Sequence, residues 1–271
     1  MPRVNKSLRE GQPVMSKETF SASRSWHAPV ADPVARARVD LAAALRWAAK
    51  LGFGEGICNH FSLALPGGDR YLINPFGVHW AEMRASHLLM LDGDGRIVEG
   101  AGEVEATAFH IHSRLHHAHD RATAVLHTHM PHATALTLVE GGRLAMAHQN
   151  ALRFWDAIAY DDDYNGLALA QDEGDRLAAS LGQARILFLA NHGVVTVGPN
   201  LAEAFDDLYY LERAAELQVL ALSTGRPLKL VADEVARRTA ADFARDRPAY
   251  AHAHFESIKR LLDAEDPSYR D

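Results

Sequence analysis

Two histidines separated by one residue, His127 and His129, are the pair in this chain best suited to bind a metal ion. They end a run of β-branched and apolar residues, so the sequence predicts a strand over 123–129. Side chains two apart on a strand point to the same face, where two imidazoles can bind one ion. A chain with 16 histidines also contains such pairs by chance, in which case both rings would belong to an ordinary turn.

A third histidine, His192, stands between two short apolar runs, 185–190 and 194–198, which we predict to be strands. An imidazole enclosed there needs a polar partner, because burial of an unpaired polar group is costly. Joining the His127 and His129 pair would supply that partner, and a hydrogen bond to the turn backbone is the alternative. Three imidazoles suit zinc, manganese or iron and leave positions open for water or a substrate.

The elements that must position these histidines alternate between helical and extended periods. Alternating apolar residues bounded by turn residues predict strands, and the remaining ones are 60–66, 70–75, 87–91 and 96–99. Helical spacing, opened by a cap residue or a proline, predicts the helices. They are 32–51, 105–119, one from 131, one from 200 to 225, and two after 232 that are separated near Pro248. The acidic run 161–163 is predicted to be a solvated loop.

The 271 residues suffice for one well-buried α/β domain with terminal extensions. We expect a flexible N-terminal arm over 1–31, a domain over 32–228 and a C-terminal helical extension over 229–271.

The net charge of −7 comes without a basic stripe, so no nucleic-acid partner is expected. The apolar runs are too short to cross a bilayer, and no membrane partner is expected. The polar N-terminal residues do not resemble a signal peptide. The single cysteine, Cys58, favours a reducing, cytoplasmic environment.

In its ordered motifs the chain resembles the class II aldolase/adducin family, from about residue 34 to about residue 224. The resemblance is carried by the segments Gly56-Ile57-Cys58-Asn59-His60-Phe61-Ser62, Ile73-Asn74-Pro75-Phe76-Gly77-Val78-His79, Ala124-Val125-Leu126-His127-Thr128-His129 and Leu189-Ala190-Asn191-His192-Gly193. It implies a three-layer α/β/α sandwich around a mainly antiparallel sheet. It also implies metal ligands at His127, His129 and His192, a small-molecule substrate, and a homotetramer with sites at the subunit interfaces.

Aldolases of this family carry a Ser-Ser-Glu segment whose glutamate binds the metal and moves a proton. Here Ala108 stands at the position of that glutamate, and Glu105 lies upstream. Glu105 either reaches the site from a displaced loop, as a catalytic group, or is a helix-start carboxylate of the kind that the helix dipole favours. His110 is the rival for a fourth ligand. Otherwise it is one of a set of surface histidines with His116, His117 and His119.

The two loops that resemble the family's substrate-binding loops predict substrate contacts at Asn59, His60, Phe76 and His79. The family's phosphate-binding serines are absent, and His60 and Phe76 make the pocket more aromatic. These departures favour a non-phosphorylated acid or an aromatic compound over a sugar phosphate.

The family's aldolases take a tyrosine from the neighbouring subunit, placed after the His-x-His pair. His148 stands in that region and is our candidate for the protonating group, because the reference pKa of a histidine side chain lies near neutrality. An interface histidine is the alternative, and Tyr160 and Tyr164 are further candidates.

The function that follows is a metal-dependent lyase. Retro-aldol cleavage or decarboxylation of a hydroxy or oxo acid leaves an enolate, whose charge a divalent cation stabilises as a Lewis acid. Zinc is the expected metal, with manganese and iron as alternatives. A non-haem Fe(II) oxygenase acting on an aromatic, 2-oxo acid or 2-hydroxy acid substrate is the second hypothesis. An adducin-like binding protein is the third, although members of that type typically lack the metal histidines that this chain retains.

Overall fold

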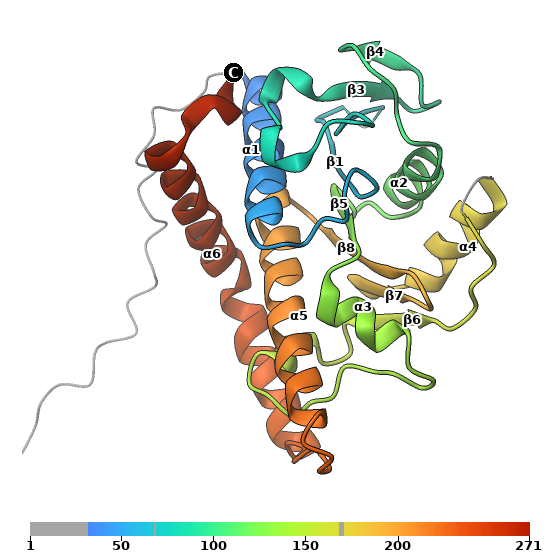
Figure 1. Cartoon of the computed structure of the whole chain (residues 1–271), viewed down its shortest axis with the longest axis vertical. Helices are drawn as coiled ribbons and strands as arrows, with labels where there is room; N and C mark the ends of the chain where they lie inside the picture. The colour runs from blue at the N-terminus through green and yellow to red at the C-terminus, as the bar shows by residue number, and fades with distance from the viewer. Residues whose placement is uncertain (1–31, 68, 168–170) are drawn as a thin grey trace, which may run out of the picture.

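An eight-stranded sheet forms the centre of the computed structural model, which describes residues 32–67, 69–167 and 171–271 (Figure 1). The predicted arm over 1–31 lies outside the described residues. The strands are β1 His60–Ala64, β2 Arg70–Ile73, β3 Leu89–Asp92, β4 Ile97–Glu99, β5 Ala124–Thr128, β6 Ile158–Asp161, β7 Ile186–Leu189 and β8 Gly193–Gly198. Their order is β4-β3-β2-β1-β5-β8-β7-β6, and only the β6–β7 pair is parallel.

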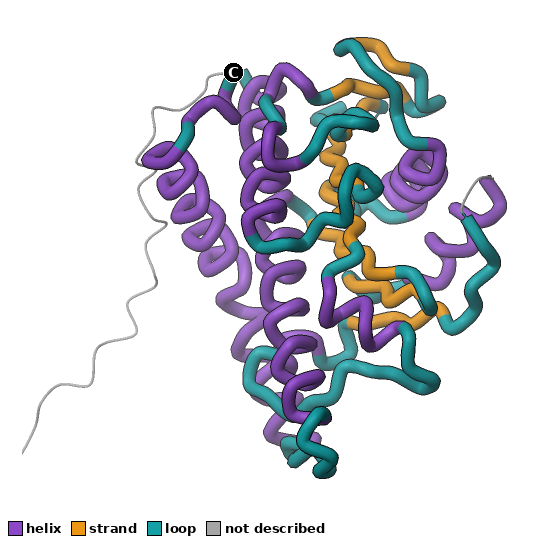
Figure 2. The backbone as a smooth tube through the Cα atoms, in the orientation of Figure 1, coloured by secondary structure: helices purple, strands orange, loops and turns teal. Residues whose placement is uncertain are grey.

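Helices cover both faces of this sheet, as Figure 2 shows. One face carries α1 (Pro33–Lys50), α5 (Leu201–Leu222) and α6 (Asp233–Glu265), and the other carries α2 (Ala106–Ala118) and α4 (Gln171–Leu181). A short helix, α3 (Pro131–Thr137), follows β5. Single 3₁₀ turns span Trp80–Glu82, Ala85–His87, Ala151–Phe154 and Pro267–Arg270. The predicted three-layer sandwich with a mainly antiparallel sheet is confirmed.

The alternation along β5 decides which layer the predicted metal ligands face. Ala124 and Leu126 belong to the core beneath α1 and α5, whereas Val125 belongs to the core beneath α2 and α4. Side chains on a strand alternate between faces, so His127 points to the same side as Val125. Its antiparallel neighbour on β1 is His60, which therefore shares that side.

The segment between β5 and β7 departs from the sequence-based expectation. Asp161 is the last residue of β6 and is only 7 % exposed, with an ion pair of 2.6 Å to Arg176 of α4. The prediction of a solvated loop over 161–163 was therefore wrong at Asp161, although Asp162 and Asp163 are exposed. Neither β6 nor α4 was predicted, because the burial of this segment depends on the pairing of β6 with β7.

The tail also differs from its prediction, because α6 continues through Pro248 instead of breaking there. Proline lacks an N–H and disfavours a helix interior. Tertiary contacts on both sides of it hold this helix together: Arg247 is bound to α5, while Phe255 and Leu262 lie in the main core.

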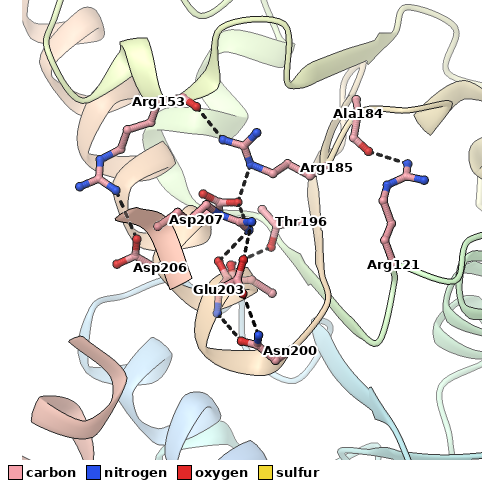
Figure 3. A network of polar contacts seen from close by, with 11 residues as sticks. Arg121, Arg153, Ala184, Arg185, Thr196, Asn200, Glu203, Asp206 and Asp207 are labelled. Atoms are coloured by element: carbon pink, nitrogen blue, oxygen red, sulfur yellow. Dashed lines mark hydrogen bonds and ion pairs between the residues drawn. The ribbon is translucent and has the colours of Figure 1, made fainter. Parts of the chain in front are cut away.

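A network of charged groups anchors α6 to α5 and to the strands (Figure 3). Arg247 lies 2.6 Å from Glu203 and 2.8 Å from Asp207, and Arg185 lies 2.7 Å from Asp207. Each of these α5 carboxylates is buried, and a buried carboxylate is stable only when it is paired. No helix in the described part of the chain is long and apolar enough to span a membrane.

Candidate metal centre

The three predicted ligands meet where β5 ends and β7 turns into β8. His127 is in β5, His129 follows it, and His192 is in the turn before β8. The ring centroids are 4.8–5.0 Å apart for every pair, so the rings form a nearly equilateral triangle. One nitrogen of each ring lies within 4.8 Å of the corresponding nitrogens of the other two.

The turn between β7 and β8 has the residues that this close approach requires. Asn191 adopts a left-handed conformation with φ 57°, which asparagine tolerates better than most residues. A Cβ on Gly193 would lie 2.5 Å from the carbonyl oxygen of Thr128 and 2.8 Å from the His129 ring. Only glycine therefore allows the turn to bring His192 against the end of β5.

Hydrogen bonds on the outer nitrogens leave the inner nitrogens free to bind an ion. His127 Nδ1 lies 3.0 Å from the carbonyl oxygen of Val194, and His129 Nδ1 contacts a carboxylate oxygen of Glu55. Both partners are acceptors, so each Nδ1 carries the hydrogen and each Nε2 carries a lone pair. Within the described residues, His129 Nε2 is buried without a hydrogen-bond partner. This donor set fits a divalent metal ion.

The surroundings also favour, in two of the imidazoles, the neutral form that metal binding requires. Burial and, to a smaller extent, the neighbouring His129 lower the pKa of His192 to about 4. The pKa of His127 is held well below its usual value by burial and by the adjacent imidazoles. Metal binding therefore needs little proton release from these two rings near neutral pH.

Asn59, a predicted substrate contact, lies beside the ligands and ties two loops together. Its Oδ1 accepts from the backbone N–H of Glu55 at 2.8 Å and of His129 at 3.4 Å. The side chain is almost fully buried, and its Nδ2 has no partner among the described residues. An unpaired buried amide is costly, so Asn59 has an N–H available for a ligand atom.

His60, the second predicted contact, lies against the centre, with its ring centroid 4.8 Å from that of His127. Its Nδ1 lies 2.7 Å from Nε2 of His112, and Ser62 links His112 to His116 through further hydrogen bonds. The prediction that His116 is a surface histidine was therefore wrong. His112 and His116 are four residues apart and share one face of α2, a spacing that could have revealed them.

Glu105 lies near the centre but outside the histidine triangle. Its carboxylate caps α2, accepting from Thr107 Oγ1 and from the N–H of Ala108. One oxygen is 4.0 Å from His60 Nε2. His110, the rival for a fourth ligand, is on the part of α2 that packs closely against Gly174 of α4.

Two other predicted contacts, Phe76 and His79, are on the loop after β2 and are exposed. The backbone N–H of Phe76 bonds to the carbonyl oxygen of Glu103, so this loop lies against the segment before α2. His79 caps the following 3₁₀ turn. Within the described residues, no hydrogen bond, ion pair or ring contact joins either side chain to the histidine triangle.

His148 is held away from the centre of its own chain. Its segment bonds to the later part of α5 and to Val231, through Ala145 N–H with Gln218 at 2.6 Å and Met146 O with Val231 N–H at 2.9 Å. The Nδ1 atom of His148 is buried and lacks a partner within the described residues.

Sequence reasoning missed Glu55, which orients His129, and Glu212, which is described below. The signal for Glu55 was its place in the Gly-rich segment 52–56, where a lone carboxylate stands beside a predicted binding loop.

Comparison with known proteins gives the family context. The model of the class II aldolase and adducin N-terminal domain matches residues 39–219. Decarboxylase NovR of Streptomyces niveus is 35 % identical over 218 residues, which cover 78 % of this chain and 80 % of that protein.

A second relative, from Streptomyces roseochromogenus subsp. oscitans, is named 4-hydroxy-3-prenylphenylpyruvate oxygenase/4-hydroxy-3-prenylbenzoate synthase. It is 35 % identical over 220 residues, which cover 79 % of each chain. Among solved structures, an aldolase II superfamily protein from Pseudomonas syringae superposes with a TM-score of 0.83 at 34 % identity. The match covers 89 % of this chain and 98 % of that one.

Proposed function

The chain belongs to the class II aldolase and adducin family, and we propose that it is a divalent-metal-dependent lyase. It cleaves a C–C bond, by retro-aldol reaction or decarboxylation, in a small hydroxy or oxo acid or an aromatic compound. The observation that carries the proposal is the histidine triangle, in which the pKa values of His127 and His192 are lowered and the buried Nε2 of His129 has no partner among the described residues. The relative named as a decarboxylase supports the reaction class.

His127, His129 and His192 would hold the metal, for which zinc is the first candidate and manganese and iron are the others. When bound, a divalent cation supplies Lewis-acid stabilisation of the negative charge that C–C cleavage leaves behind. The N–H groups of Asn59 Nδ2 donate to a substrate oxygen, and the surrounding buried side chains exclude water.

Two further groups donate or accept protons in this proposal. Glu105 lies beside His60, since the carboxylate oxygen that caps α2 is also the one 4.0 Å from His60 Nε2, and its other oxygen takes no part in the cap. His148 reaches the centre of a neighbouring subunit in a homotetramer, where its unpartnered Nδ1 acquires a partner. Phe76 and His79 line the entrance from the loop after β2.

The test is metal content and affinity, measured by elemental analysis and calorimetry on protein purified without chelator. We expect about one ion per chain, and a loss of affinity of at least about 100-fold for His127→Ala and for His129→Ala. His117→Ala removes an exposed histidine of α2 and should bind as the unmodified protein does. Unchanged binding in both ligand variants would overturn the assignment.

An Fe(II) oxygenase is the second candidate, because one relative carries an oxygenase name. Oxygen uptake by the Fe(II)-loaded protein with a 4-hydroxyphenylpyruvate-type acid separates the two reactions. Substrate-dependent uptake supports the oxygenase, whereas product release without uptake supports the lyase. Absence of stoichiometric metal would instead support an adducin-like binding role.

A further inference from the structure

A continuous row of hydrogen bonds runs from the metal centre into the interior beneath α2. His60 Nδ1 lies 2.7 Å from His112 Nε2, and His112 Nδ1 bonds to Ser62 Oγ. Ser62 Oγ lies 2.7 Å from His116 Nε2, and His116 Nδ1 bonds to the carbonyl oxygen of Ala122. We call His60, His112, Ser62 and His116 the imidazole chain. His60 is 2 % exposed, while Ser62 and His112 are fully buried.

The carbonyl oxygen of Ala122 determines the direction of every hydrogen bond in the imidazole chain. A carbonyl oxygen only accepts, so His116 carries its hydrogen on Nδ1. Burial lowers the pKa of His116 to about 4, and its Nε2 is therefore a lone pair that accepts from the Ser62 hydroxyl. Ser62 in turn accepts from His112 Nδ1–H, which leaves His112 Nε2 as an acceptor for His60 Nδ1–H.

This direction leaves His60 Nε2 as a lone pair at the edge of the centre. A carboxylate oxygen of Glu105 lies 4.0 Å from this Nε2. Neither atom has a hydrogen to offer the other, so the space between them suits a donor group. An O–H group placed there would lie beside His127, whose ring contacts that of His60.

We propose that His60 is a substrate-binding residue whose Nε2 accepts a hydrogen bond from a substrate hydroxyl. His112, Ser62 and His116 are the positioning residues that hold it in this tautomer. The inference rests on the proposed function and narrows its substrate class to acids with a free hydroxyl beside the carboxylate. A site built around a hydrogen-bond acceptor discriminates against an analogue that lacks the donor, because its buried polar groups are then left unpaired.

The tautomers are measured directly by ¹⁵N NMR of the imidazoles in metal-free protein at neutral pH. We expect the hydrogen on Nδ1 in His60, His112 and His116. Ser62→Ala removes the bridge, and His60 should then become a mixture of tautomers. Ser113→Ala is the matched control, because Ser113 is on α2 and its hydroxyl bonds to the carbonyl oxygen of Phe109, outside the imidazole chain. An Nε2–H on His60 in the unmodified protein, or an unchanged His60 in Ser62→Ala, would overturn the proposal.

Selectivity is measured with zinc-loaded protein by calorimetry, using glycolate and methoxyacetate as probes. We expect glycolate to bind at least about tenfold more tightly. His60→Phe should retain zinc and lose this preference. Equal binding of the two probes, or no glycolate binding by zinc-loaded protein, contradicts the role of His60. Failure to bind zinc contradicts the proposed function instead. The NMR experiment needs no metal, so it still measures the tautomers of the imidazole chain.

Discussion

At the scale of single residues, the group that accepts a hydrogen bond from the outer nitrogen of a histidine determines its tautomer. The carbonyl oxygens of Val194 and Ala122 each take the Nδ1 hydrogen of one histidine, and the carboxylate of Glu55 takes that of another. A fixed partner on one nitrogen decides the tautomer, and therefore what the other nitrogen can do. The metal-binding and substrate-binding roles that we propose for these histidines thus depend on atoms outside the histidine triangle.

The buried histidines also make stability depend on pH. The unfolded chain binds a proton at each histidine near pH 6.5, whereas folded His116 does so only near pH 4, and the pKa of His112 is likewise held well below its usual value by burial. Between these values the unfolded state binds more protons, so stability is lost as pH falls through this range. We expect a slope of up to about 1.4 kcal/mol per pH unit for each such histidine.

Urea denaturation of metal-free protein between pH 7 and pH 4.5 measures this slope. His116→Gln should make it shallower by about the contribution of one proton, whereas His117→Gln, at an exposed position, should leave it unchanged. A slope in His116→Gln equal to that of the unmodified protein would contradict the assignment.

At the scale of elements, the His-x-His strand depends on the helix that follows it. Met130 at the head of α3 provides no side-chain cap, and Glu212 of α5 takes that role. Its carboxylate accepts from the backbone N–H groups of His132 and Ala133 at 2.9 Å and lies 2.8 Å from His132 Nδ1. A buried carboxylate thereby satisfies N–H groups that a helix start otherwise leaves unpaired.

Glu212→Gln should therefore lower the free energy of unfolding by about 1–3 kcal/mol, because it replaces one carboxylate oxygen with an N–H that faces backbone N–H groups. Glu216→Gln, one turn further along α5, loses only a surface pair with Arg213 and serves as the control. Equilibrium urea unfolding measures both. A change below about 0.5 kcal/mol in Glu212→Gln would show that the cap is dispensable.

At the scale of the whole molecule, large apolar side chains remain exposed after α3. Leu138 and Val139, which follow α3, are 60 % and 61 % exposed. Exposed apolar groups that gather in one place mark interaction surfaces. Together with the unpartnered Nδ1 of His148, they support the proposal that the active form is a homotetramer with sites at the subunit interfaces.

Native mass spectrometry at micromolar protein should then give four times the chain mass of 29.7 kDa. Val139→Glu places a charge in the proposed contact and should shift the population toward smaller species, because an unpaired charge in an interface is costly. Glu140→Gln, at the next exposed position, should leave the assembly intact. A monomer at all concentrations would contradict the tetramer.

The sequence by itself determined the features that depend on one element and its ends. Strand alternation predicted that His127 and His129 share a side, the cap signal at Asp32 predicted the start of α1, and the turn residues around Gly193 predicted the break between β7 and β8. These patterns report which face of an element is apolar, and that information is local.

Only the tertiary structure decided which faces meet. His60 and His112 are 52 residues apart, and Glu55 and His129 are 74 apart, so their contacts depend on strand order and on where α2 crosses the sheet. Asp161 is buried and Pro248 lies within a helix for the same reason. In each case, contacts with residues distant in sequence compensate for a conformation or burial that is locally unfavourable. The energy of packing and of buried polar pairs is a property of neighbours in space, which a single pattern along the chain does not contain.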